Sequence, residues 1–448
     1  MSFASLFAQL LNGLAGSSAL FLVAAGLTLI FGVTRVVNFA HGSLYMLGAY
    51  IAWTLVDSLP RGPLGFWGGV VAAALVVAAA GALIEALILK RIYAAPELLQ
   101  LAATFGIVLI VRDLALALWG AEDLLGPRAP GLAGALDVFG RAIPTYDLLL
   151  LVVGPVVLVS LWWLLERTRF GVLIRAATEN RVLAGALGID ERALFTAVFA
   201  LGAFLAGLAG ALQLPREPAN LGMDLSVIAE AFVVTVVGGL GSIPGAFLAA
   251  LLIGLTKAIC IVLGTVDIGG LIVAFPKLTL VAEFVVMAVV LAVKPYGLLG
   301  VPPAALPMTP IAEFRALIVP PGRHAAVGAM VALALAALLP FTGDEYRLIL
   351  ATDILVLALF TASLQFLMGT GGIASFGHAA YFGLGAYAAA LAVRHGWPMA
   401  AALAVSPLAA LAGALVFGWF CVRLSGVYLA MLTLAFAQIV WSVAFQWD

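Results

Sequence analysis

Long apolar runs separated by short polar breaks dominate the chain from beginning to end. A helix needs about 20 apolar residues to cross a bilayer core, and most of these runs approach that length. The pattern predicts an all-α polytopic membrane fold with about 14 transmembrane or re-entrant helices. The candidate spans are Ser5–Phe31, Ser43–Asp57, Leu64–Leu89, Leu99–Trp119, Asp147–Leu165, Ala193–Leu212, Leu225–Val237, Ile243–Leu263, Lys277–Val293, Ala326–Leu339, Leu348–Met368, Ala379–Val393, Met399–Cys421 and Val427–Phe445.

Composition agrees with a lipid environment. Hydrophobic residues make up 65% of the chain and charged residues 10%, whereas soluble domains carry about 25% charged residues. The first apolar stretch has no basic region before it, so we interpret it as a retained helix and not a signal peptide. No basic tract indicates nucleic-acid binding. Cys260 and Cys421 lie inside apolar runs, and the four histidines lack ligand spacing, so neither a metal site nor a catalytic constellation is predicted.

Orientation follows from Lys and Arg in the short loops, which are enriched on the cytoplasmic side. Loop 166–192 is the most basic, with five arginines, and we place it in the cytoplasm. For the loops up to residue 324, this choice puts eleven basic residues inside and five outside. The five outside residues are Arg61, Arg128, Arg141, Arg216 and Lys277.

A proline-rich segment separates two homologous units, which are expected to be parallel because the span count places both histidine motifs on the cytoplasmic side. Proline interrupts helices, so residues 296–322 are predicted to be a cytoplasmic linker between a first unit at 1–295 and a second at 323–448. Residues 38–52 and 375–389 match at seven of 15 positions with a fixed offset of 337. The second copy stops at a point equivalent to about residue 117 of the first and is expected to be incomplete. The repeat motif comprises Asn38, Phe39, His41, Gly48 and Tyr50, with Phe376, His378, Gly385 and Tyr387 in the second copy.

Several segments resemble the permeases of branched-chain amino-acid ATP-binding-cassette importers, with the two permease types fused head to tail. Residues 26–50, 171–190, 199–212 and 236–254 are similar to the first type, and residues 369–387 and 422–440 to the second. The resemblance implies a transport permease of a bacterial-type inner membrane, for branched-chain or other small aliphatic amino acids, and not an enzyme. It implies two ATP-binding-cassette ATPase subunits and an external solute-binding protein as partners, with another permease chain as a further option. ATP would be used by the partners, and no cofactor is expected on this chain.

Three other interpretations stay open. In the first, the chain belongs to an importer of the same family whose solute is urea or a short amide. Alternatively, the chain is a gradient-driven carrier or channel, an interpretation that intramembrane carboxylates and histidines would support. Finally, the missing end is compatible with a membrane scaffold or a non-functional fragment.

Loop 171–190 is the candidate for coupling to an ATPase, an assignment that rests mainly on the resemblance. A coupling element needs a short docking helix with small residues for close approach and charges for specificity. An ordinary basic loop that only sets topology is the alternative. The coupling residues are Arg175, Ala176, Ala177, Glu179, Asn180, Ala184, Gly188 and Asp190.

The candidate solute path or gate combines a charge and a glycine-rich break. Glu230 lies in a short apolar segment, and its alternative role is an ion pair with Lys257. The break resembles a phosphate-binding loop, but none of the four lysines follows a glycine, so the motif is absent. Simple re-entrant packing is the alternative for the break, which includes Gly238, Gly239, Gly241, Ser242 and Pro244.

The two matched histidines are candidate proton carriers, because histidine titrates near physiological pH. We favour a structural role for His41 and His378, in which each ring ties down a tight turn at the membrane edge. Stripes of small residues at 202, 206 and 210 and at 203, 207 and 211 predict close helix packing.

Overall fold

The computed structural model describes residues 3–60, 62–93, 95–268, 271–301, 322–338, 345–422, 424 and 426–445. Within them, nine helices are long and apolar enough to cross a membrane, and Val281–Val293 and Ala326–Leu335 are shorter apolar helices. The all-α polytopic fold is therefore confirmed, whereas the number of about 14 spans stays a prediction. Most of the predicted linker, residues 302–321, lies outside the described residues.

The chain divides into two compact units, which are described separately. Unit 1 comprises Met1–Val301 with Trp441–Asp448, and unit 2 comprises Pro302–Val440. The elements of unit 1 are α1 Phe3–Thr34, α2 Ala40–Ser58, α3 Pro63–Ile84, the π-helix η1 Glu85–Leu89, α4 Lys90–Ile92, α5 Glu97–Trp119, β1 Ala135–Val138, β2 Arg141–Pro144, α6 Thr145–Arg167, α7 Arg169–Glu179, α8 Arg181–Ala186, α9 Glu191–Gln213, α10 Met223–Gly238, α11 Ile243–Leu263, β3 Thr265–Ile268, β4 Leu271–Ala274, the 3-10 helix η2 Phe275–Leu278 and α12 Thr279–Val293.

Helices also make up unit 2 in the part that the structure describes. Its elements are α13 Arg323–Leu338, α14 Glu345–Gln365, the π-helix η4 Phe366–Thr370, α15 His378–Arg394, α16 Met399–Cys421 and most of α17 Gly426–Phe445.

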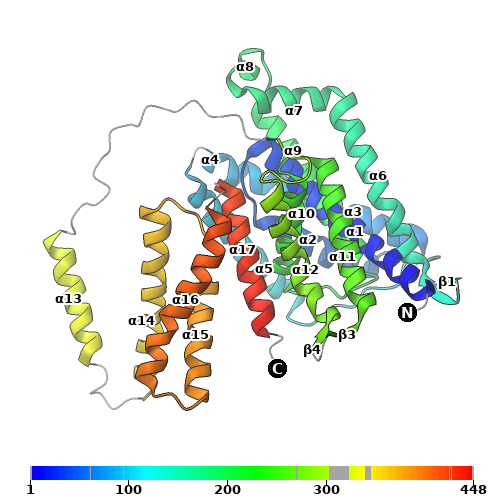
Figure 1. Cartoon of the computed structure of the whole chain (residues 1–448). Coiled ribbons are helices and arrows are strands. Elements are labelled where there is room, and N and C mark those ends of the chain that lie inside the picture. The colour runs from blue at the N-terminus through cyan, green and yellow to red at the C-terminus, as the bar shows by residue number, and fades with distance from the viewer. Residues whose placement is uncertain are drawn as a thin grey trace. The chain divides into compact units, whose positions relative to one another are not determined.

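Unit 1 has two distinct ends. The helices α7 and α8 project from one end, and the two antiparallel hairpins β1–β2 and β3–β4 lie at the other (Figure 1). The helices α6 and α9 connect these ends, since α6 runs from β2 to α7 and α9 runs back from α8. We call residues 169–190 the arm, and the opposite side the hairpin end.

Small residues bring the helices of unit 1 into backbone contact. A Cβ on Gly48 of α2 would lie 2.6 Å from the Cα of Gly207 on α9. A Cβ on Gly26 of α1 would lie 2.6 Å from the carbonyl oxygen of Gly202 on α9. Side chains of any size would force these helices apart. The close packing predicted from the small-residue stripes of α9 is confirmed.

The backbone is not helical just before α2, although this segment lies inside the bundle. Thr34 ends α1, Arg35 adopts a left-handed conformation with φ 57°, and Val36, Val37 and Asn38 are buried. The His41 ring then lies against the carbonyl of Val23, 3.0 Å away. Because Val23 precedes the end of α1 by eleven residues, α2 begins about 16 Å inside that end. The chain therefore re-enters the bundle before α2 starts.

Side chains satisfy the backbone of this break. The hydroxyl of Thr34 accepts the amide of Val36 at 3.2 Å, and the Asn38 side-chain oxygen accepts the amide of Ala40 at 3.1 Å. Without water, exposed amides at this depth need such partners. Specific side-chain hydrogen bonds therefore stabilise the break.

Unit 2 repeats the break at matched positions. Gly372, which is 337 residues after Arg35, is also left-handed with φ 63°, and a non-helical segment leads to α15 at His378. The amide of Phe376 donates to the Thr433 hydroxyl at 3.0 Å. The sequence repeat therefore corresponds to a repeated backbone path within each unit.

The contact between α2 and α9 gives a test of the fold. Gly48→Val should markedly lower the thermal unfolding temperature of the detergent-purified chain, because overpacking costs about 1–3 kcal/mol even where side chains can shift, and here backbone is in the way. Gly68→Val is the matched control, since nothing lies within 4 Å of a Cβ at Gly68. Equal unfolding temperatures for the two variants would contradict this packing.

Candidate functional site

Buried polar side chains gather where α2 and α10 begin. Asn38, His41 and Ser43 are fully buried and Asp224 is 1% exposed. Each has a polar atom without a hydrogen-bond partner: Asn38 Nδ2, His41 Nδ1, Ser43 Oγ and Asp224 Oδ2. The two helix starts are in contact, because the backbone of Asp224 packs against Gly42. Buried polar atoms are nearly always paired, so four unpaired ones beside a helix break make this region a candidate polar site.

His41 lies differently from the prediction. His41 is not at the membrane edge but deep in unit 1, where its Nε2 lies 3.0 Å from the Val23 carbonyl oxygen. The sequence suggested an edge position because His41 precedes an apolar run. The return of the backbone into the bundle, which places it deeper, leaves no signal in hydropathy. The hydrogen bond itself agrees with a structural role.

In unit 2 the equivalent ring has a side-chain partner. His378 Nε2 lies 2.7 Å from the Ser363 hydroxyl. At the offset of 337, Ser363 corresponds to Gly26, and a Cβ on Gly26 would lie 2.9 Å from the His41 ring. Ser375 Oγ and His378 Nδ1 are unpaired, as are Asn38 Nδ2 and His41 Nδ1 at the same positions of unit 1. Both units therefore have unpaired polar atoms at these two matched positions of the break.

The other residues of the repeat motif have packing roles. Phe39 packs on Phe232 with ring centroids 4.9 Å apart, and the buried Tyr50 stacks on Trp119 at 5.1 Å. In unit 2, a Cβ on Gly385 would lie 2.9 Å from the Ser406 hydroxyl, whereas Tyr387 is 53% exposed. Phe376 contributes its backbone amide, as described above.

Three helices meet at an ion cluster around Lys257. Its Nζ on α11 lies 3.0 Å from Glu230 Oε1 on α10 and 2.7 Å from Glu283 Oε2 on α12. The ion pair that was the alternative role for Glu230 is therefore present, and its role in a solute path stays a prediction. Sequence reasoning did not connect Glu283 to this pair, because nothing in the sequence indicates that α12 packs beside α10 and α11.

The glycine-rich break is a tight turn between α10 and α11 at the end of unit 1 opposite the hairpins. Gly239 and Gly241 have φ values of 104° and 85°, and a Cβ on Gly32, near the end of α1, would lie 3.1 Å from the Cα of Gly241. Ser242 caps α11 by accepting the Gly245 amide at 3.2 Å, and Pro244 stands in the first turn of that helix.

The turn is also held by the chain that follows α12. The amides of Leu298 and Leu299 donate to the carbonyls of Val237 and Gly238 at 2.7 and 3.0 Å. Glu230 lies eight residues, or about 12 Å, along α10 from Gly238. The structure therefore does not bring Glu230 and the glycine turn together, and the observed contacts of the turn are packing contacts.

The arm is a compact pair of capped helices. The side chain of Thr168 begins α7, Asn180 Oδ1 accepts the Leu183 amide at 3.0 Å to begin α8, and Asp190 Oδ1 accepts the Arg192 amide at 3.0 Å to begin α9. Such caps stabilise each helix start by about 1 kcal/mol and fix the turns. Gly188, with φ 85°, ends the α8 turn. A glycine in this left-handed conformation is a common way to end a helix.

Of the other predicted coupling residues, Ala177 and Ala184 are buried. Arg175, Ala176 and Glu179 are exposed, and Arg175 Nη1 lies 3.5 Å from Glu166 Oε2. Sequence reasoning missed two large apolar side chains, Leu183 and Leu187, which are 61% and 82% exposed. Their signal was present, since leucine in a loop of charged residues has no lipid to cover it.

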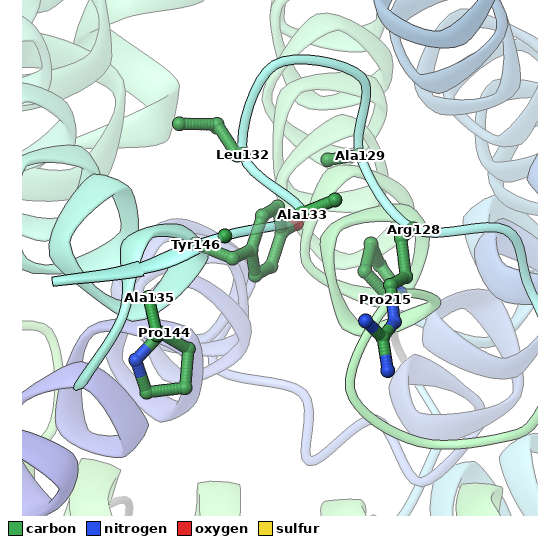
Figure 2. Close-up of a pocket in the computed structure, with 9 residues that line it drawn as sticks. Arg128, Ala129, Leu132, Ala133, Ala135, Pro144, Tyr146 and Pro215 are labelled. Carbon is green, nitrogen blue, oxygen red and sulfur yellow. The ribbon is translucent and has the colours of Figure 1, made fainter. Parts of the chain in front are cut away.

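At the hairpin end, the segment between α5 and α6 forms a cap held to the segment between α9 and α10. Leu124 and Ala219 exchange backbone hydrogen bonds of 2.9 Å, and the Tyr146 hydroxyl donates to the Leu212 carbonyl at 2.6 Å. Figure 2 shows a pocket of about 340 Å³ in this cap, with Tyr146 between Pro144 and Arg128. The cap is thus a fixed surface and contains a guanidinium.

These features define a polytopic helical membrane protein with an interrupted, polar interior and a projecting polar arm. The sequence matches the family described as "Branched-chain amino acid transport system / permease component" over residues 9–293 and 346–448. The chain belongs to this family of transport permeases and is not an enzyme.

Individual relatives agree with the family. The chain is 30% identical over 306 residues to the high-affinity branched-chain amino acid transport system permease protein BraD of Pseudomonas aeruginosa, covering 66% of this chain and 95% of BraD. It is 27% identical over 311 residues to LivH of Escherichia coli, with the same coverage. The ribose import permease RbsC of Escherichia coli is 28% identical over 262 residues, 55% of this chain and 75% of RbsC. No solved structure shows a significant match.

The ion cluster predicts unequal costs for its members. Lys257→Met should destabilise the chain by about 3–5 kcal/mol, because it leaves the buried Glu283 carboxylate without a counter-charge. Glu230→Gln should lower the stability less, because the Glu230 side chain is 37% exposed and the ion pair between Lys257 and Glu283 remains. Thermal unfolding in detergent measures the stability of both variants. The double variant Lys257→Met/Glu283→Leu should regain much of the stability that Lys257→Met loses, because no charge is then left unpaired at Glu283. A larger loss for Glu230→Gln than for Lys257→Met would contradict this account.

Proposed function

We propose that this chain is the membrane-spanning permease of an ATP-driven importer and that branched-chain amino acids are its solutes. Membership of the permease family and the names of BraD and LivH support the solute class. The curated relatives cover only 66% of this chain, although the chain covers 95% of each relative. This difference in length supports a fusion of a first permease unit at 1–295 with a second unit at 323–448.

The exposed apolar side chains of the arm carry the proposal of coupling. Leu183 and Leu187 stand in water on a helix pair whose ends are fixed by caps. Exposed leucines on a rigid polar surface favour a covering partner. A rigid arm can pass the movement of a soluble ATPase to α6 and α9, which continue directly into the bundle. Glu179 and Arg175 would give the docking its charge specificity.

The break before α2 supplies the proposed solute path. The starts of α2 and α10 bring the positive ends of two helix dipoles together inside the bundle, beside the unpaired atoms of Asn38, Ser43 and Asp224. Broken helices of this kind hold anionic solute groups in transporters. An amino-acid carboxylate would meet the helix starts, and the Asp224 carboxylate would meet its ammonium group.

The remaining partners follow from this assignment. Two ATP-binding-cassette ATPase subunits would dock at the arm, which lies in the cytoplasm of a bacterial-type cell with the chain in its inner membrane. An external solute-binding protein would deliver solute to the hairpin end, with another permease chain as a further partner. ATP would be bound by the ATPase subunits, in agreement with a sequence in which no lysine follows a glycine.

The scaffold does not fix the solute, because a ribose permease also matches it. Urea or short amides stay the alternative solutes within the same family. A gradient-driven carrier is the alternative mechanism, but Lys257 already compensates the charge of Glu230, the carboxylate that would favour it. Uptake that survives ATP depletion and stops when the ion gradient is removed would identify a carrier.

The arm predicts a specific loss of assembly. When the tagged chain is extracted from its native membranes, ATPase subunits should copurify, and Leu187→Asp should lower their yield by about tenfold or more, because a charge at the centre of an apolar contact costs more than about 1.4 kcal/mol. Leu136→Asp on β1 is the matched control, since Leu136 is also exposed but lies at the hairpin end.

Membrane insertion of both variants is checked by their yield and unfolding temperature. If ATPase subunits copurify equally with both variants, the arm is not the docking site. If no ATPase accompanies the folded, unaltered chain, the importer assignment is wrong.

A further inference from the structure

A second cleft lies beside the pocket of Figure 2 at the hairpin end. It has a volume of about 540 Å³, within the range of about 300–1,000 Å³ typical of small-molecule sites. Arg128 lines both hollows, and Figure 2 shows its side chain on the edge of the first. The cleft is formed by the end of α2, the start of α3 and the segment after α5, all within unit 1.

The cleft carries one charge of each sign. Asp57, near the end of α2, and Arg128 both line it, and both are exposed. Within the described part of the chain, no salt bridge or hydrogen bond engages either side chain, and the two do not pair with each other within 4.0 Å. In contrast, Arg216 and Asp147 at the same end are paired at 3.2 Å. Asp57 and Arg128 therefore remain available to a ligand.

The rest of the lining is mostly apolar and is held in place. Trp53, Val56, Phe66 and Leu125 supply the walls, and the Trp53 Nε1 donates to the Leu125 carbonyl at 3.1 Å. The bridge between Leu124 and Ala219 fixes the segment that carries Leu125. A preformed apolar cleft with two separated, opposite charges costs little reorganisation when a ligand binds.

We infer that this cleft is a receiving site for a small zwitterion with an aliphatic side chain, whose carboxylate binds Arg128 and whose ammonium group binds Asp57. A guanidinium can hold a carboxylate through two parallel hydrogen bonds, and the apolar walls would cover the aliphatic chain. The inference rests on the proposed function, which places this end of unit 1 outside, where solute arrives. The cleft would hold solute before it enters the path beside α2.

The test uses the full-length chain in lipid nanodiscs without binding protein or ATPase. Saturation-transfer NMR would measure three probes: L-leucine, 4-methylpentanoate, which lacks the ammonium group, and 3-methylbutylamine, which lacks the carboxylate. Asp57→Asn and Arg128→Gln should each weaken leucine binding by about tenfold or more, because each removes a charge-assisted hydrogen bond. Asp57→Asn should leave 4-methylpentanoate binding unchanged, and Arg128→Gln should leave 3-methylbutylamine binding unchanged.

Asp123→Asn and Arg141→Gln are the matched controls, since both residues are exposed in the same α5–α6 segment but do not line the cleft. Leucine binding that is unchanged in Asp57→Asn and Arg128→Gln would overturn the inference. The inference would also be overturned if Asp57→Asn and Arg128→Gln each weakened the binding of all three probes to the same extent. Copurification of ATPase subunits through the arm tests the proposed function separately, so the two failures are distinguishable.

Discussion

The rest of unit 1 depends on one constraint, the need to satisfy a non-helical backbone inside a bundle that lipid surrounds. Between α1 and α2 the chain leaves the helical hydrogen-bond pattern, and the side chains of Thr34 and Asn38 replace the lost backbone partners. This arrangement is stable only if neighbouring helices exclude lipid from the break. The glycine contacts of α2 with α9 and α10 provide that exclusion. The polar interior of unit 1 therefore depends on the close packing of its helices.

The same constraint links structure to transport. A break costs stability, yet it places the starts of α2 and α10 beside the unpaired atoms of Ser43 and Asp224, whereas a continuous helix would keep its backbone groups bonded internally. At one end of unit 1 the arm would receive work from an ATPase, and at the other the Asp57–Arg128 cleft would receive solute. The path through the break would connect these two ends, and α6 and α9 would carry movement between them.

Hydropathy predicted the all-α fold because long apolar runs have few other structures available in lipid. The small-residue stripes of α9 and the repeat offset of 337 were also readable, and the offset was recovered in the matched left-handed positions 35 and 372. Depth was not readable, so His41 was placed at an edge. Tertiary proximity was also hidden: Glu283 joins Lys257, and Asp57 shares a cleft with Arg128, across 26 and 71 residues of sequence. The exposure of Leu187 could have been expected from its place among charged loop residues, but sequence reasoning did not use that signal.

Water access to Ser43 tests the central claim, that the break before α2 lines the solute path. In a chain carrying Cys260→Ala and Cys421→Ala, Ser43→Cys should react with a membrane-impermeant thiol reagent. Leucine, or ATP acting through the ATPase subunits, should change the rate of this reaction. Asp123→Cys at the hairpin end is the reactive control, and Val159→Cys, on the exposed face of α6, is the unreactive one. A Ser43→Cys thiol that stays inert in every state, while Asp123→Cys reacts, would contradict the account.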